Sequence, residues 1–218
     1  MVVPALNLQL ECLQKGWCQA DDGTVPEGDL CMAEAAKREA TYEDLYGIPE
    51  GAVGEIIDGE LIVTPRPSRK HGFSAYALGG ELLPPYQFGR GGGPGGWVII
   101  GEPEVKFGEN YLVPDIAGWR RERFPESEET NWISVSPDWI AEILSPSTIR
   151  LDRIKKMAIY AEHGVPYLWL IDPTAKTLEV FRLQSGGWLL RSVFGGSDNV
   201  RVEPFADIEI DLKNLWIE

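Results

Sequence analysis

The sequence predicts an α/β (α+β) fold in which a mixed central β-sheet is flanked by helices. A strand-like run over 139–145, a helical pattern over 149–163 and a continuous apolar run over 167–172 follow one another. Such a strand–helix–strand unit joins parallel strands through a right-handed crossover, and a continuous apolar strand is typical of a sheet centre. The alternating runs that come next indicate antiparallel strands, so we expect the sheet to be mixed.

Residues 1–40 are predicted to be an N-terminal extension, and residues 41–218 to be one domain. A chain of 218 residues is long enough for a single domain with a sizeable core. The extension holds every cysteine of the chain, and an odd number without a CxxC pair fits neither a disulfide framework nor a zinc site. We therefore expect reduced thiols and a cytoplasmic protein. The cysteines are Cys12, Cys18 and Cys31.

Neither a membrane span nor a signal peptide is expected. No apolar run approaches the roughly 18 residues that a transmembrane helix needs. The first residues lack the basic start and long apolar stretch of a signal peptide.

The first part of the domain is expected to hold a hairpin and then a helix. Thr41 can cap a short helix before the hairpin. Residues 55–63 form two apolar runs around Asp58-Gly59, the dipeptide that tight primed turns favour. The helical pattern then extends over 68–88, until Pro84-Pro85 end or bend it. The inner face of this helix, best defined over 72–88, is predicted from helical spacing: Phe73, Ala77, Leu78 and Leu82.

Strands and loops fill the middle of the chain. Residues 89–96 include six glycines and indicate a flexible loop that lacks the pattern of a phosphate-binding loop. Residues 97–100, 104–107 and 111–119 are predicted strands joined by short turns, and residues 122–132 are a charged loop.

The last part is predicted to be a strand, a helix and three further strands. Ser147 or Thr148 can cap the helix over 149–163. Residues 177–182 and 188–193 alternate like the strands of a meander. The predicted inner face of the helix consists of apolar residues: Ile154, Met157, Ala158 and Ala161.

Two acidic residues lie within the strand-like runs. Glu142 interrupts an otherwise apolar strand, where an ionised carboxylate is costly unless it is paired or binds a metal. Asp115 follows Pro114, and a proline in a strand suggests a bulge or a strand end that can aim the next side chain at a site. Two carboxylates from neighbouring strands suit Mg²⁺ or Mn²⁺. With a nearby lysine to neutralise developing charge, the pattern indicates a metal-dependent phosphodiesterase.

The charge of the chain argues against a generic nucleic-acid binder. The formal net charge is -14, whereas phosphate contacts favour a basic surface. Three local basic groups nevertheless flank the candidate site residues, either as ordinary solvated faces or as phosphate contacts. They are Arg66, Arg69 and Lys70; Arg120, Arg121 and Arg123; and Arg150, Arg153, Lys155 and Lys156.

The order of these residues resembles the PD-(D/E)xK nuclease superfamily, whose motif is Pro-Asp followed by an acid, one residue and a lysine on a strand. Pro114-Asp115 matches this motif, whereas Leu144 stands where the lysine belongs. The chain resembles the Uma2 family of endonucleases more closely, over about residues 41–183, which implies a restriction endonuclease-like fold. The matching residues are Glu55, Asp58-Gly-Glu60, Pro67, His71, Val113-Pro-Asp115, Glu142-Ile-Leu-Ser-Pro-Ser-Thr148, Asp152, Lys156, Tyr160 and Gly164-Val-Pro-Tyr-Leu-Trp-Leu-Ile-Asp-Pro173.

The resemblance also implies catalytic roles. Asp115 and Glu142 are expected to bind Mg²⁺ or Mn²⁺, and Lys156 is expected to replace the missing strand lysine from the following helix. Asp152, Lys156 and Tyr160 are four residues apart, so they share one helix face. Asp152 is expected either to orient its neighbours or to take part in catalysis.

Two further residues are expected to be accessory groups. Under the resemblance His71 lies near the site as a metal ligand or phosphate contact, and otherwise it caps or packs against its helix. Glu55 and Glu60 flank the hairpin turn and can project to one face. Glu60 is the preferred accessory acid of the two.

Three functions are compatible with these residues. The leading hypothesis is a Mg²⁺-dependent endonuclease that hydrolyses the phosphodiester bonds of DNA, and a homodimer would suit a duplex substrate. The alternative is a non-catalytic module of nuclease fold that binds nucleic acid or protein. A metal-dependent hydrolase of smaller phosphoesters is the third.

Overall fold

The computed structural model describes residues 38–125 and 129–217. The predicted extension over 1–40 therefore lies almost entirely outside the described residues, as do its three cysteines. Within the described ranges no helix is both long and apolar enough to cross a bilayer.

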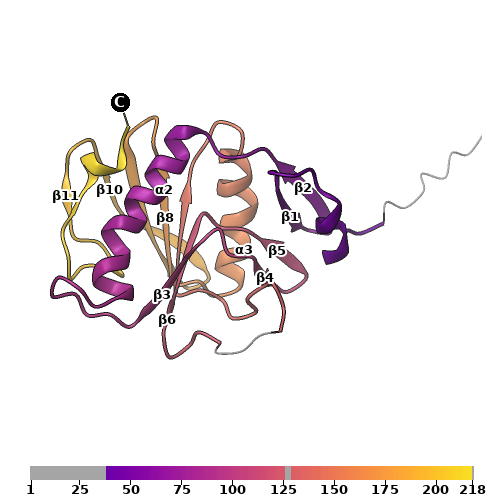
Figure 1. Cartoon of the computed structure of the whole chain (residues 1–218), viewed down its shortest axis with the longest axis horizontal. Helices are drawn as coiled ribbons and strands as arrows, with labels where there is room; N and C mark the ends of the chain where they lie inside the picture. Colours follow the sequence, from indigo (N-terminus) through magenta and orange to yellow (C-terminus); the bar gives the residue numbers. More distant parts are fainter. Residues whose placement is uncertain (1–37, 126–128, 218) are drawn as a thin grey trace, which may run out of the picture. The chain divides into compact units, whose positions relative to one another are not determined.

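Two sheets and a small strand pair form the framework of the described chain (Figure 1). The four-stranded sheet has the order β2-β1-β5-β4, and the six-stranded sheet has the order β10-β9-β8-β7-β6-β3. The elements in chain order are η1 (Tyr42–Gly47), β1 (Val53–Ile57), β2 (Glu60–Thr64), α2 (Arg69–Leu82), η2 (Leu83–Gln87), β3 (Trp97–Gly101), β4 (Val105–Phe107), β5 (Asn110–Leu112), β6 (Ile116–Arg120), β7 (Trp139–Ile143), η3 (Leu151–Lys156), α3 (Met157–Glu162), β8 (Tyr167–Asp172), β9 (Thr177–Gln184), β10 (Gly187–Gly195), β11 (Asn199–Val200), β12 (Ile210–Asp211) and η4 (Leu212–Leu215).

The six-stranded sheet is mixed, as the sequence predicts. β7 and β8 are parallel and are joined by the crossover through η3 and α3, whereas the other neighbouring pairs are antiparallel. β8 lies inside the sheet, which agrees with its continuous apolar sequence. β9 and β10 extend the sheet as the expected meander.

The two faces of the large sheet pack against different helices. Trp139, Ala141 and Ile143 of β7 belong to the core that contains the buried leucines of α2. Ile140 and Leu144 belong to the core on the other face, which contains residues of α3. Because side chains alternate along a strand, the residue between Ala141 and Ile143 faces α3. That residue is Glu142.

The hairpin β1–β2 forms with the predicted turn. Ile57 pairs with Glu60 across the turn, and Asp58 and Gly59 have φ angles of 53° and 73°. Two successive residues with positive φ define the primed turn that matches strand twist.

The single strand predicted over 111–119 is wrong, because the chain passes there from one sheet to the other. β5 pairs with β1 and β4 in the small sheet, whereas β6 pairs with β3 and β7 in the large one. Pro114 lies in the gap and has no N–H to donate to a ladder. Asp115 is therefore at the junction of the two sheets, immediately before β6.

The predicted inner face of the 149–163 helix is only partly right: Met157 packs against the core, but two of the other predicted residues face solvent. Ile154 is 62% exposed and Ala158 is exposed, whereas Asp152 and Lys156 are buried. The first part of this helix is the π-helical segment η3, and it turns a polar face toward the sheet. The acids of the sheet pair with that face, so the apolar side chain of Ile154 points to solvent.

Helix α2 departs from its predicted face in the same way. Leu78 and Leu82 are buried as expected, but Phe73 is 40% exposed. His71 and Ser74 are buried instead, and the Ser74 hydroxyl donates to the Leu215 carbonyl at 2.6 Å. The helix then continues into the π-helical segment η2, where the Phe88 N–H donates to the Leu83 carbonyl.

Candidate active site

Asp115 and Glu142 lie opposite each other on two paired strands. The antiparallel register joins Ile116 to Ala141, which places the preceding Asp115 across from the following Glu142. Opposite residues of an antiparallel pair have Cβ atoms only about 5 Å apart. The Asp115 N–H donates to Glu142 Oε2 at 3.4 Å, and the Ile143 N–H donates to Asp115 Oδ2 at 2.6 Å. The sheet itself therefore fixes the two carboxylates side by side.

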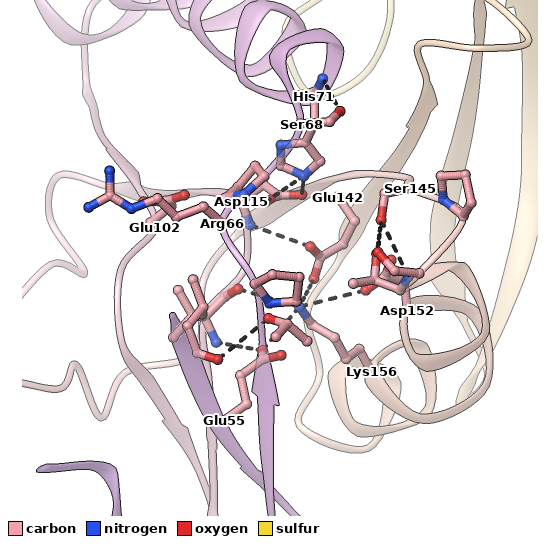
Figure 2. Close-up of a pocket in the computed structure, with 18 residues that line it drawn as sticks. Glu55, Arg66, Ser68, His71, Glu102, Asp115, Glu142, Ser145, Asp152 and Lys156 are labelled. Atoms are coloured by element: carbon pink, nitrogen blue, oxygen red, sulfur yellow. Dashed lines mark hydrogen bonds and ion pairs between the residues drawn. The ribbon is translucent and has the colours of Figure 1, made fainter. Parts of the chain in front are cut away.

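Lys156 reaches this pair from η3. Its Nζ lies 2.9 Å from Glu142 Oε1, 3.1 Å from Glu55 Oε1 and 3.8 Å from Asp152 Oδ1. Figure 2 shows the three carboxylates pointing toward this ammonium from different elements. The Lys156 side chain is 4% exposed, so its charge is stabilised by these carboxylates rather than by water.

Other side chains hold the two acids in place. The Tyr160 hydroxyl donates to Glu142 Oε1 at 2.5 Å. His71 Nε2 lies 3.1 Å from both carboxylate oxygens of Asp115, and Ser68 caps α2 by accepting from the His71 N–H. Each acid thus has a polar partner on a helix as well as contacts within the sheet.

The site has more buried acidic side chains than basic ones. Burial raises the pKa of Glu142 to about 8, although Lys156 partly offsets this shift. Burial likewise raises the pKa of Asp152 to about 6. Burial alone would lower the pKa of Lys156, but Glu142 and Glu55 raise it well above its ordinary value. The lysine therefore remains charged, while the raised pKa of Glu142 lets that carboxyl retain its proton into the neutral range.

The pKa of His71, which contacts Asp115, is also set by two opposing effects. Burial would lower the pKa of His71, but its hydrogen bond to Asp115 and the charge of that carboxylate raise it overall. The His71 ring is therefore available as a cationic partner for Asp115.

The acids line a cavity of about 320 Å³ between the two sheets and the starts of α2 and η3. Figure 2 shows this cavity with its polar side chains. Its acidic and basic lining residues are Glu55, Arg66, His71, Glu102, Asp115, Glu142, Asp152 and Lys156. A ligand in this cavity would meet both acids and the lysine.

Asp115 and Glu142 are suitable ligands for a hard divalent cation. Among the residues that the structure describes, Glu142 Oε2 accepts only the long contact from the Asp115 N–H, so it retains acceptor capacity. Within the described parts of the chain, no group of three or more acidic, histidine or cysteine side chains encloses a possible metal position. Mg²⁺ can bind through one or two carboxylates together with waters and substrate phosphate, so Asp115 and Glu142 are a chemically suitable pair.

The structure brings together five of the six residues selected from the sequence. Asp115, Glu142, Lys156, His71 and Asp152 all line the cavity.

The sixth residue, Glu60, is exposed and does not line the cavity. Glu55 faces the cavity instead, where it is 4% exposed and accepts from the Val113 N–H at 2.8 Å. Glu55 lies on β1, between β2 and β5, whereas Glu60 lies on the edge strand beside the turn.

Some lining residues were not selected from the sequence. Ser145 lies at the start of the loop that leads to η3, where its hydroxyl accepts from the Thr148 N–H at 3.3 Å. Glu102 has a φ of 49°, which is uncommon for a residue other than glycine, and its N–H donates to the Asp115 carbonyl. A Gly-Glu-Pro turn gives no sign in the sequence of proximity to Asp115.

Comparisons with known proteins identify the family and the fold of the chain. One solved structure is described as that of "a putative nuclease belonging to DUF820" from Anabaena variabilis; it is 27% identical, with a TM-score of 0.62, and the match covers 81% of this chain and 97% of that chain. Among curated proteins none matches. The family model Uma2, described as "Putative restriction endonuclease", matches residues 40–213. The predicted family and fold class are confirmed, and the chain belongs to the Uma2 family.

Proposed function

We propose that this protein is an endonuclease that hydrolyses phosphodiester bonds of DNA with the help of Mg²⁺ or Mn²⁺. The observation that carries the proposal is the contact between Lys156 and Glu142 beside Asp115, at the wall of a cavity. The family description and the nuclease of Anabaena variabilis support the same class of reaction.

Asp115 and Glu142 are the proposed metal ligands. A cation bound there supplies Lewis-acid polarisation of the scissile phosphate. The Tyr160 hydroxyl orients Glu142, and the His71 ring orients Asp115. Both acids thus meet the phosphate in a fixed position, which lowers the reorganisation needed at the moment of reaction.

Lys156 is proposed to stabilise the transition state. Water attacks the phosphorus, a new P–O bond forms, and the ester bond to the leaving oxygen breaks as that oxygen gains a proton. Negative charge accumulates on the phosphate oxygens during this step. A lysine that stays charged in a buried, water-poor position stabilises such charge more strongly than an exposed lysine does.

The test is cleavage of supercoiled plasmid and of single-stranded DNA with Mg²⁺ or Mn²⁺. Glu142→Gln keeps the size of the side chain but removes its charge, and we expect cleavage to fall by about 100-fold or more. Glu209→Gln is the matched control, because Glu209 is exposed and lies outside the cavity. Chelation of the metal should abolish cleavage by the wild type.

The other two hypotheses predict different results. A non-catalytic module would bind DNA or a protein without cleaving any strand, even with either metal present. A hydrolase of small phosphoesters would hydrolyse an activated phosphodiester such as bis(p-nitrophenyl) phosphate but leave both DNA substrates intact. Cleavage that Glu142→Gln does not reduce would contradict the proposed site.

A further inference from the structure

A second, larger cavity adjoins the candidate active site. Its volume is about 490 Å³, within the range of roughly 300–1,000 Å³ that is typical of small-molecule sites. Its wall on α2 is unusually open, because Gly72, Gly79 and Gly80 have no side chains there. Tyr76 lies at this wall and is 87% exposed. We call this cavity the α2 groove.

The α2 groove shares part of its lining with the active-site cavity. His71, Glu102 and Asp115 line both of them, as does Pro67. A polynucleotide whose scissile phosphate lies at Asp115 places an adjacent nucleotide near these shared residues, because successive nucleotides of a strand are covalently linked and rise only about 3.4 Å along the helix axis.

The chemistry of the α2 groove suits a nucleobase and not a phosphate. No lysine or arginine is among the described residues that line it, and two of its lining residues are the acids Glu102 and Asp115. His71 also lines the groove, but it is paired with Asp115, so the groove attracts a phosphate less than the proposed metal position does. Most of the remaining lining is apolar or glycine, and an exposed aromatic ring such as Tyr76 offers a stacking surface to any base.

We propose that the α2 groove binds one unpaired nucleobase next to the scissile phosphate, so that the preferred substrate is single-stranded DNA or DNA with an extruded base. A paired base cannot enter such a groove without leaving its stack. The net charge of -14 gives a further reason, because stacking adds affinity to the few phosphate contacts that a strongly acidic protein can make. This inference rests on the proposed function for the position of the phosphate.

Two substitutions test the groove without touching the catalytic residues. Tyr76→Ala removes the stacking surface, and Tyr46→Ala is the matched control because Tyr46 is another exposed tyrosine, 71% exposed, on η1. Gly80→Leu fills the groove, since a Cβ at Gly80 meets no atom within 4 Å. Leucine is also a better helix former than glycine, so this variant should fold and melt at or above the wild-type temperature.

The primary measurement is fluorescence anisotropy of a labelled single-stranded oligonucleotide, with EDTA present so that no strand is cut. We expect the wild type to bind the single strand more tightly than the same sequence in a duplex. Tyr76→Ala and Gly80→Leu should each weaken single-strand binding by about 5- to 150-fold, the range for loss of one stacked base. Tyr46→Ala should bind like the wild type.

A second measurement separates this inference from the proposed function. Bis(p-nitrophenyl) phosphate carries no nucleobase. Its rate of hydrolysis should therefore be equal in the wild type and in all three variants. If the wild type cleaves neither this diester nor DNA, the proposed function fails. The anisotropy measurement still tests whether the α2 groove binds a nucleobase. Wild-type affinity for the single strand in both folded groove variants would overturn the nucleobase proposal.

Discussion

At the scale of single residues, the site depends on one lysine surrounded by acids. Lys156 contacts Glu55, Glu142 and Asp152, and each of these side chains is nearly inaccessible to solvent. Removing one partner of a buried ion pair leaves the other without compensation, which commonly costs about 3–5 kcal/mol. Because the acids outnumber the lysine, removal of a single acid should be tolerated better than removal of Lys156.

Glu55 is predicted to be a positioning residue for Lys156. Glu55→Gln removes one of the carboxylates that hold the ammonium and should lower cleavage by about 10- to 100-fold, the usual cost of losing a supporting partner of an active-site group. Glu60→Gln is the matched control, because Glu60 belongs to the same hairpin but is exposed. A pH–rate profile is the discriminating measurement: Glu55→Gln should shift its alkaline limb to lower pH, since Lys156 loses a group that raises its pKa. An unshifted limb with reduced activity would mean that Glu55 has only a structural role.

The raised pKa of Glu142 predicts how the stability of the metal-free protein varies with pH. The pKa is about 8 in the folded chain, against an ordinary value of 4.5, so folding favours the protonated carboxyl. Stability from this group is complete below about pH 4.5 and is lost as the pH rises through 8. Asp152, with its pKa raised to about 6, acts in the same direction at lower pH.

Thermal melting with EDTA between pH 5 and about 8.5 measures this effect. We expect the melting temperature of the wild type to fall across the range and that of Glu142→Gln to fall less, because glutamine does not titrate. Glu209→Gln should follow the wild type. Parallel curves for the wild type and Glu142→Gln would show that Glu142 ionises freely in the folded protein.

At the scale of elements, the acids of the site were more predictable than the faces of the helices. Glu142 is conspicuous because a carboxylate within an apolar strand has few explanations, and Asp115 because Pro114 marks a strand end. Glu55 carries a similar signal, but from the sequence Glu60 beside the turn was the preferred accessory acid. The pairing of β1 between β2 and β5 distinguishes them, and long-range pairing of this kind has no local signature.

Helix faces were mispredicted where polar side chains are buried. Hydrophobic periodicity assumes that apolar residues face the core, and in η3 the buried residues are Asp152 and Lys156. The passage from β5 to β6 was missed for a related reason. A proline can mark either a bulge in one strand or a change of sheet, and the sequence around Pro114 does not decide between these possibilities.

The reversed face of η3 predicts an unusual tolerance at Ile154. Ile154→Gln should change the free energy of unfolding by only about 0.5 kcal/mol, because its side chain is 62% exposed. Ile159→Ala in α3 should cost about 2–5 kcal/mol, because Ile159 is 5% exposed and its loss leaves a cavity in the core. Urea denaturation of the two variants compares them directly. A larger loss of unfolding free energy for Ile154→Gln than for Ile159→Ala would support the helix face expected from periodicity and contradict the one that the structure shows.

At the scale of the whole molecule, the protein must bring an anionic substrate to an acidic chain. The net charge of -14 opposes association with DNA, and the cavity itself has an excess of carboxylates. Arg66 is a cationic residue of the cavity lining that is exposed to solvent, and Arg69 and Lys70 follow it at the start of α2. Local attraction from this group would act against the overall repulsion, chiefly within a Debye length of about 8–10 Å.

Arg66 is therefore predicted to contact substrate phosphate. The affinity of a single-stranded oligonucleotide for the wild type and for Arg66→Ala, measured over a series of salt concentrations, gives the number of phosphate contacts from the slope of log K against log salt. Each contact to single-stranded DNA contributes about -0.7 to this slope, so Arg66→Ala should bind more weakly and with a slope shallower by about 0.7.

Arg191→Ala is the matched control, because Arg191 is an exposed arginine on β10 that does not line the cavity. Its slope should equal that of the wild type, although removal of one positive charge lowers the net charge of both variants equally. Equal weakening in the two variants would show that only overall charge governs binding. A shallower slope in Arg66→Ala alone would place a phosphate at the mouth of the cavity and give the substrate strand a path from α2 toward Asp115 and Glu142.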